Sequence, residues 1–244
     1  MKKHHSDQYK DIFGRAIKAY YNEKDTTNIT VHSPDFDDDI IPVEYLFRNF
    51  EQMPVLEQKA LGLCSGKVLD VGCGAGSHGL FLQNERSLQV TGIDISPGAV
   101  EIASQRGLKD ARQLDYFNLK TEKFDTILFL MNGTGIIGRL NKLDEFFSHT
   151  RSLLNAGGKV LLDSSDLRFL YDEDEEGGIW VDLAAGYYGE LKFRISYKDE
   201  VSEEFDWLYL DFDSLELAAA KNRFSCTLLQ KGEHYDYLAE LKPL

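Results

Sequence analysis

Hydrophobic residues along this chain change between strand-like runs and helix-like spacing. Val68, Leu69 and Val71 form a short apolar run, glycines follow at alternate positions, and an apolar helical pattern starts near Leu80. This order predicts a strand, a tight turn and a helix. Alternation of strands with helical segments is typical of the α/β class. Further strand patterns lie within residues 87–93, 111–119, 124–135 and 154–163.

The chain before the first of these strands contains helical and irregular segments. Residues 6–22 carry apolar side chains at helical spacing after a cap at Ser6, and residues 43–50 and 54–63 each predict a short helix. Residues 28–39 are irregular and acidic, and we expect a solvated loop there.

Strand-like alternation returns after the fifth strand. Residues 187–197 alternate between apolar and polar side chains, and residues 205–209 do the same after a polar break. Two such runs predict a hairpin of half-buried strands. A helix over 212–222 and a closing hairpin over 224–229 and 235–241 complete the predicted elements.

The glycines after the first strand indicate a ligand-binding turn. Gly72, Gly74 and Gly76 permit backbone angles that a Cβ would forbid, and they let a ligand lie directly against the main chain. The helix that follows offers free N–H groups that suit a carboxylate or a phosphate. Gly74, Gly76 and Gly79 also fit the G-x-G-x-x-G pattern of dinucleotide sites. The loop therefore predicts a nucleotide-type cofactor and leaves its class open.

An acidic residue makes the pattern more specific. The string Asp70-x-Gly72-x-Gly74-x-Gly76 resembles the first motif of class I S-adenosylmethionine (SAM) dependent methyltransferases. Asp94 ends the second strand, where its carboxylate can accept hydrogen bonds from two ribose hydroxyls and repels a ribose 2′-phosphate. Asp94 therefore serves SAM or NAD and does not separate these two cofactors.

The third and later strands do separate them. Asp115 and Tyr116 follow the third strand, where the methyltransferase family carries an acid that accepts the adenine amino group, and an aromatic beside it can lie against the adenine ring. Residues 124–135 and 154–163 are similar to the family's fourth and fifth strands. The resemblance covers residues 60–163 closely.

This resemblance implies a fold and the segments of one domain. The fold would be α/β, a three-layer Rossmann-like sheet of seven strands whose last strand is antiparallel, with an N-terminal helical cap and an inserted β-hairpin flap. The segments expected in the single domain 1–244 are the cap (1–62), a cofactor-binding core (63–163), the flap (164–211) and a closing helix and hairpin (212–244).

The resemblance also implies the cofactor contacts. SAM would bind at the carboxyl edge of the sheet, with S-adenosyl-L-homocysteine (SAH) as the product. The implied contacts are Asp70, Gly72, Cys73, Gly74, Gly76, Asp94, Ile95, Asp115, Tyr116 and Met131.

Residues outside the core are candidates for the acceptor side of the site. Arg48 can hold the carboxylate of SAM through two parallel N–H bonds. Asn132 follows the fourth strand, but the Asn- or Asp-Pro-Pro-aromatic string of amino-group methyltransferases is absent there. Aromatics of the flap, Trp180 among them, could wall an acceptor pocket or bury a homodimer interface. The candidate substrate contacts are Tyr20, Tyr45, Arg48, Asn132, Tyr187 and Trp207.

Methyl transfer from SAM is an in-line displacement that needs little covalent help from a protein. Holding the acceptor about 3–3.5 Å from the methyl group can supply several kcal/mol. A general base is needed only where the acceptor carries a proton, and the candidate bases are His32, Asp163 and Tyr20.

Charge and composition narrow the partners. Acidic residues number 41 against 27 Lys and Arg, and the resulting net charge of −14 repels a phosphate backbone, so we expect no nucleic-acid partner. Three cysteines at unrelated spacings indicate neither a disulfide framework nor a zinc site, and we expect no metal. The longest apolar run, 127–131, is too short to span a membrane. We expect a cytoplasmic protein with a small-molecule substrate.

The sequence therefore predicts SAM-dependent methyl transfer to a small molecule, with two alternatives open. An NAD-linked oxidoreductase would share the glycine loop and Asp94, but it leaves Asp115 and Tyr116 unexplained. A non-catalytic SAM-binding module would keep the same cofactor residues.

Overall fold

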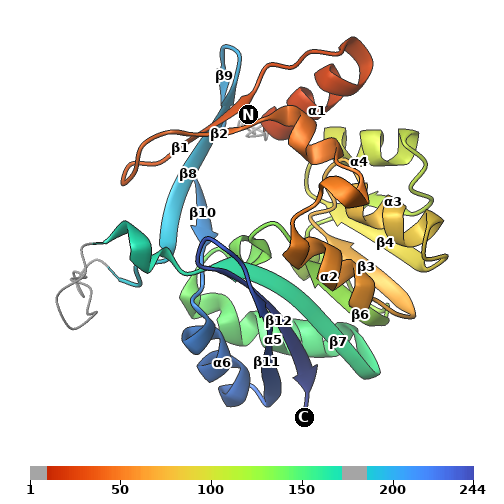
Figure 1. The fold of residues 1–244 in the computed structure, drawn as a ribbon, viewed down its shortest axis with the longest axis vertical. Helices are drawn as coiled ribbons and strands as arrows, with labels where there is room; N and C mark the ends of the chain where they lie inside the picture. Colours follow the sequence, from red (N-terminus) through yellow and green to blue (C-terminus); the bar gives the residue numbers. More distant parts are fainter. Residues whose placement is uncertain (1–9, 172–185) are drawn as a thin grey trace, which may run out of the picture.

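The computed structural model describes residues 10–171 and 186–244, so that Ser6, Trp180 and the acidic run at 172–178 lie outside the described residues. Its central feature is a sheet of seven strands (Figure 1). The five strands of the predicted core run parallel to one another, whereas the last strand of the chain runs antiparallel to both of its neighbours. The predicted seven-stranded sheet with an antiparallel last strand is confirmed. In spatial order the strands are β11 (Phe224–Lys231), β12 (Asp236–Pro243), β7 (Leu154–Ser165), β6 (Phe124–Phe129), β3 (Lys67–Val71), β4 (Gln89–Asp94) and β5 (Ala111–Gln113).

Both faces of this sheet are buried. Val68 and Leu69 are neighbours in β3, yet they belong to two different hydrophobic clusters, one on each face. A parallel strand that is covered on both faces needs a nearly continuous apolar run, which explains the composition of β3. The three-layer α/β fold is therefore confirmed. One cluster packs against α2 (Val55–Leu63), α3 (Ser77–Asn84) and α4 (Pro97–Gln105), and the other against α5 (Leu143–Leu153) and α6 (Phe212–Lys221).

A second, antiparallel sheet is built from two distant parts of the chain, and we call it the flap sheet. Phe205 lies opposite Phe193 and Trp207 lies opposite Leu191, so the predicted flap hairpin is confirmed. The flap sheet contains β10 (Phe205–Leu208), β8 (Glu190–Tyr197), β1 (Ile29–His32) and β2 (Asp39–Ile41) in this order, and β9 (Glu200–Val201) pairs with β8.

The solvated loop predicted for residues 28–39 is wrong at both of its ends, which form β1 and β2. Strand β1 lies between β2 and β8, with Val31 opposite Ile195. The four residues of β1 are too few to show a period, and the strand that stabilises them lies far along the chain, so no local pattern indicates the pairing. The N-terminal cap and the flap, predicted as separate additions, thus share one sheet.

The flap sheet turns an apolar face to the core and is supported at two ends. Ile29 and Tyr197 pack with residues of α1 (Ile12–Glu23) and α4 at one end. At the other end, β10 packs against the 3-10 helix η4, where Trp207 covers Gly135. Figure 1 shows β8 and β10 standing over one end of the seven-stranded sheet between these supports.

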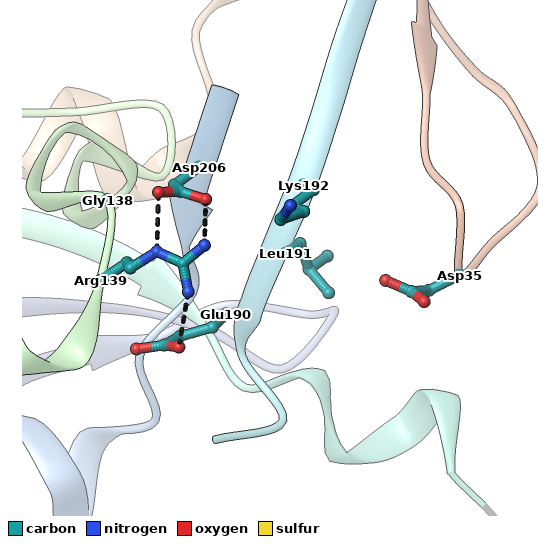
Figure 2. Close-up of a pocket in the computed structure, with 7 residues that line it drawn as sticks. All are labelled: Asp35, Gly138, Arg139, Glu190, Leu191, Lys192 and Asp206. Atoms are coloured by element: carbon teal, nitrogen blue, oxygen red, sulfur yellow. Dashed lines mark hydrogen bonds and ion pairs between the residues drawn. The ribbon is translucent and has the colours of Figure 1, made fainter. Parts of the chain in front are cut away.

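Ion pairs connect the opposite, charged face of the flap sheet to the loop that follows η4. Arg139 donates from Nε to Asp206 at 2.7 Å, and its Nη1 lies 3.6 Å from Glu190 (Figure 2). Lys192 and Asp35 line the same hollow, a cavity of about 180 Å³. Because Arg139 follows η4 and its partners lie on β10 and β8, these pairs tie both flap strands to the loop after β6.

Short 3-10 helices fill several connections between the main elements. The helix predicted at 43–50 is present as two 3-10 turns, and the helix predicted at 54–63 is α2. In the ranges 10–171 and 186–244, no helix combines the length and the apolar character needed to cross a membrane. The 3-10 helices are η1 (Val43–Phe47), η2 (Phe50–Gln52), η3 (Tyr116–Asn118), η4 (Gly133–Ile137), η5 (Leu140–Lys142) and η6 (Leu167–Leu170).

Replacing Gly135 with alanine should lower the free energy of unfolding, because the new Cβ would overlap the Trp207 ring. Overpacking of this kind costs about 1–3 kcal/mol, which urea unfolding measures. Gly62→Ala is the matched control, since a Cβ at Gly62 meets nothing within 4 Å and alanine favours the helix. Equal stabilities of the two variants would contradict the packing of Trp207 on Gly135.

Candidate functional site

The glycine loop lies at the carboxyl end of β3 and leads into α3. Gly72, Gly74 and Gly76 have φ angles of 72°, 52° and 85°, a left-handed region that favours glycine. A Cβ at Gly74 would meet nothing within 4 Å, so the backbone angle and not packing requires glycine there, and the loop keeps an open side. The Cys73 side chain is buried against Gly92, so this residue can contact a ligand only through its main chain.

Asp94 braces this loop from the end of β4. Its Oδ2 accepts the N–H of Gly74 at 2.9 Å, and its Oδ1 accepts the N–H of Ser96 at 2.9 Å. Burial raises the pKa of the Asp94 carboxyl group and outweighs the lowering effect of these two bonds. Ile95 follows with 52% of its surface exposed. A large apolar side chain thus lies open beside the acid, an arrangement that suits an adenosine group.

Asp115 and Tyr116, after β5, are placed differently from each other. Asp115 is exposed and caps η3 by accepting the N–H of Phe117 at 2.8 Å. Tyr116 is only 3% exposed, its ring meets Phe129 edge-on, and its hydroxyl lies 2.7 Å from Thr150 Oγ1. The expectation that the Tyr116 ring lies against an adenine is wrong, because this side chain turns inward and fills the core. Asp115 stays a predicted adenine contact.

The turn after β6 has a strained backbone that Asp163 holds in place. Met131 and Asn132 are consecutive non-glycine residues with φ angles of 65° and 57°, a conformation that costs on the order of 1–3 kcal/mol per residue. Asp163, near the end of β7, accepts the N–H of Met131 at 3.1 Å and the N–H of Gly133 at 3.2 Å. Met131 is 36% exposed, so this turn adds a second open apolar side chain at the same edge of the sheet.

Asp163 is buried, and its environment favours the protonated form. Burial raises the pKa of Asp163 to about 7 against the lowering effect of the N–H groups of Gly133 and Met131, and the nearby charge of Glu57 acts in the same direction as burial. Because both carboxylate oxygens face backbone donors, the side chain stabilises the turn. To act as the predicted general base, Asp163 would have to accept a proton while its oxygens face the N–H groups of Met131 and Gly133.

Arg48 lies buried beside the same turn in a network of polar groups. Its Nη2 lies 3.0 Å and 3.1 Å from the two carboxylate oxygens of Glu57 and 3.6 Å from Sδ of Met131. Its Nε donates to the carbonyl of Tyr45 at 2.7 Å, and the guanidinium lies over the Tyr45 ring at 3.5 Å. On the far side of Glu57, Nε2 of His78 lies 2.7 Å from Oε2.

The pKa values in this network favour its charged forms. Burial acts to raise the pKa of Glu57, but the hydrogen bond to His78 and the charges of His78 and Arg48 outweigh it and lower this pKa. Burial acts to lower the pKa of His78, but the hydrogen bond to Glu57 and the charge of Asp70 outweigh it and raise that pKa. With His78 protonated, Arg48, Glu57 and His78 together carry one net positive charge.

Two buried side-chain atoms within the described residues lack a hydrogen-bond partner, and both border this site: Nη1 of Arg48 and Oδ2 of Asp70. Asp70 lies in β3 directly before the glycine loop, and burial raises its pKa. Buried polar groups are normally paired, so these two suit a ligand that carries both a carboxylate and an ammonium group. The amino-acid end of SAM carries both, and the site therefore fits the cofactor that the resemblance implies.

Three aromatic residues predicted to contact the substrate lie in separate parts of the structure. Tyr20 of α1 packs against Phe47, with 4.7 Å between the ring centroids. Tyr187 donates its hydroxyl to Asp211 at 2.5 Å and is partly buried against the core. Trp207 lies on the apolar face of the flap sheet. Among the residues that the structure describes, no group of three His, Cys, Asp or Glu side chains is placed to hold a metal ion.

His32 lies on the face of the flap sheet that is turned away from the core. Its Nε2 lies 2.8 Å from Oγ of Ser196, and its Nδ1 lies 2.9 Å from Asp38. A role for His32 as a base over the cofactor is therefore wrong, because strand alternation turns this side chain outward. Asn132 accepts a hydrogen bond from Ser165 at 2.8 Å, which occupies its side-chain oxygen.

The sequence reasoning missed Glu57 and His78. A signal for Glu57 was present, because this acid lies among the apolar positions of α2, next to Leu56 and one turn before Ala60 and Leu61. A charged residue on the buried side of a helix requires a charged or polar partner. His78 sits in the first turn of the helix that follows the glycine loop, where its ring reaches back to Glu57.

Comparisons with known proteins agree with this geometry. Residues 69–160 match the sequence profile of a family described as a methyltransferase domain. A SAM-dependent methyltransferase from Bacteroides fragilis, solved in complex with SAH, is 48% identical to this chain with a TM-score of 0.88, and the match covers 96% of this chain and 95% of that one. The CcbJ methyltransferase of Streptomyces caelestis shares the fold at 11% identity and a TM-score of 0.59, over 81% of this chain and 99% of that one.

Curated relatives match over a shorter part. The ubiquinone biosynthesis O-methyltransferase of Pasteurella multocida is 34% identical over 98 residues, which are 39% of this chain and 39% of that enzyme. The enzyme of the same name from Idiomarina loihiensis is 41% identical over 61 residues, 25% of each chain. This chain thus spans well under half the length of the curated relatives that it matches.

Asp94→Asn should weaken SAH binding at least about tenfold, because the amide keeps the shape of the side chain but loses the charge that strengthens its hydrogen bonds to the loop and to a ribose. Titration calorimetry measures this affinity. Glu101→Gln is the control, since Glu101 pairs with Lys18 on the outer surface, and it should leave the affinity unchanged. Equal affinities of wild type and Asp94→Asn would remove Asp94 from the cofactor site.

Asp163 should make the protein less stable as pH rises from about 4 to about 7. Its folded pKa of about 7 lies above the ordinary value of 3.8, so its contribution is fully present below pH 4 and is lost as the folded group ionises. Asp163→Asn does not titrate there. The melting temperature of wild type minus that of Asp163→Asn should therefore fall across this pH range, and a constant difference would contradict the raised pKa.

Proposed function

Because the chain belongs to the SAM-dependent methyltransferases, we propose that it is an enzyme that transfers the methyl group of SAM to a small-molecule acceptor. The observation that carries this proposal is the pair of unpartnered buried groups on Arg48 and Asp70 beside the open glycine loop. NAD has no free amino-acid end to pair with them. The SAH complex of the Bacteroides fragilis relative supports the same choice of cofactor.

The residues of the site suit the work that such a transfer requires. SAM supplies an activated methyl group on its sulfonium, so the protein has to bind, orient and exclude water. The glycine loop, Asp94 and Ile95 would hold the adenosine part, and Arg48 would hold the amino-acid end. Asp163 stays the candidate base for an acceptor that carries a proton, because its pKa of about 7 is close to neutral.

The flap sheet supports a small acceptor with a flat apolar part. Phe193, Phe205 and Trp207 lie on its apolar face and are half-buried. The ring of Phe205 meets Phe193 and Trp207 edge-on. Such rings bind other flat apolar groups well, so we assign them to one wall of the acceptor site. The homodimer interface, the other role considered for the flap aromatics, stays a prediction.

The net charge and the state of the cysteines support two further parts of the proposal, the class of acceptor and the cellular compartment. The net charge of −14 favours an acceptor other than nucleic acid. The three cysteines, Cys64, Cys73 and Cys226, are all free thiols. Free thiols persist where glutathione and thioredoxin keep them reduced, and we therefore assign the enzyme to the cytoplasm.

Thermal melting with SAM, SAH and NAD in parallel tests the cofactor, because a ligand that binds only the folded state raises its stability. SAM and SAH should raise the melting temperature and NAD should not. Incubation with methyl-labelled SAM and a cell extract, fractionated afterwards, should then place label among small molecules. Label in RNA or protein would overturn the small-molecule acceptor, and binding of SAM without any transfer would favour a non-catalytic module.

A further inference from the structure

Glu57 and His78 lie behind Arg48, and methyl transfer itself has no need of either residue. We propose that they are positioning residues, which hold Arg48 so that its Nη1 faces the carboxylate of the cofactor and thereby set the preference for SAM and SAH over adenosine compounds that lack the amino-acid end. This inference rests on the proposed function, since it concerns the same cofactor site.

The contacts of Arg48 leave one direction free. Glu57 engages Nη2, the carbonyl of Tyr45 engages Nε, and the Tyr45 ring covers one face of the guanidinium. Nη1 alone is buried without a partner. A guanidinium is planar and rigid, so fixing Nε and Nη2 also fixes the direction in which Nη1 donates.

The supporting residues come from both sides of the cofactor strand. Glu57 lies on α2, which precedes β3, and His78 lies in the first turn of α3, which follows the glycine loop. The hydrogen bond of 2.7 Å between them therefore links Arg48 to the helix that begins at the loop. This link fixes the position of Arg48 relative to the glycine loop, so that one ligand can contact both.

A contribution to folding stability is a weak explanation for burying these three charged side chains together. Arg48, Glu57 and His78 are each at most 8% exposed. Burying an ion pair has a desolvation penalty that its attraction often fails to exceed, and apolar residues of similar size are commonly as stable. An arginine that needs an exact direction gains from a buried carboxylate, because both oxygens of Glu57 lie within hydrogen-bond distance of Nη2 while the Tyr45 carbonyl holds Nε.

Glu57→Gln tests this role through binding. The variant should bind SAH about tenfold more weakly, as expected for loss of a charged hydrogen bond that orients Arg48. It should bind 5′-methylthioadenosine, which has the adenosine and sulfur but no amino-acid end, with unchanged affinity. Both affinities come from titration calorimetry. Glu122→Gln removes the partner of Lys67 and Arg112 away from the site and should change neither.

A second variant shows whether Glu57 acts through Arg48. Arg48→Lys keeps a positive charge but loses the planar guanidinium. It should also weaken the binding of SAH and leave the affinity for 5′-methylthioadenosine unchanged. If Glu57 works only by holding Arg48, the double variant Arg48→Lys, Glu57→Gln should bind SAH no more weakly than Arg48→Lys.

The outcomes separate this inference from the proposed function. If the wild type binds neither SAH nor 5′-methylthioadenosine, the proposed function is refuted. If the wild type binds, three results would refute the positioning role. Glu57→Gln could bind SAH as tightly as the wild type, or it could lose the same affinity for SAH and for 5′-methylthioadenosine. The third result is a double variant that binds SAH more weakly than Arg48→Lys. Melting curves establish that each variant folds. Should Glu57→Gln not fold, His78→Leu carries the same test with the same outcomes, since it removes both the hydrogen bond and the charge behind Glu57.

Discussion

Burial of both faces of the seven-stranded sheet is the constraint on which the rest of the structure depends. Strands covered on two sides have no surface for polar chemistry, so polar groups gather where the strands end. Asp70 and Asp94 lie at such ends, and Asp163 lies near the end of β7. Burial also raises the pKa of each of these carboxyl groups. The same constraint that builds the core thus concentrates buried acids around the glycine loop.

The flap sheet closes the same edge from the other side. Its two supports, Tyr197 against α1 and Trp207 against Gly135, leave the aromatic side chains between them half-buried. Arg139 anchors the outer face of the sheet to the loop after η4 through Asp206. Core and flap are therefore joined by apolar packing on one face of the flap sheet and by ion pairs on the other.

Charged groups at the site are organised in a chain of contacts, each of which fixes the next. His78 restrains Glu57, Glu57 restrains Arg48, and Arg48 lies against Met131 in the turn that Asp163 holds. The strained backbone of that turn persists because the surrounding hydrogen bonds determine it. Nη1 of Arg48, within this arrangement, and Oδ2 of Asp70 are buried and unpaired, which suits a ligand that carries both a carboxylate and an ammonium group.

The sequence by itself determined the local features: the order of core strands, the glycines whose φ angles require them, and the acid at the end of β4. These follow from hydrophobic period and backbone sterics, which act between near neighbours. Only the tertiary structure decided that residues 28–39 contribute strands, that Tyr116 turns into the core and that His32 faces outward. It also joined Glu57 to His78, because hydrogen bonds and ion pairs between distant segments leave no period in the chain.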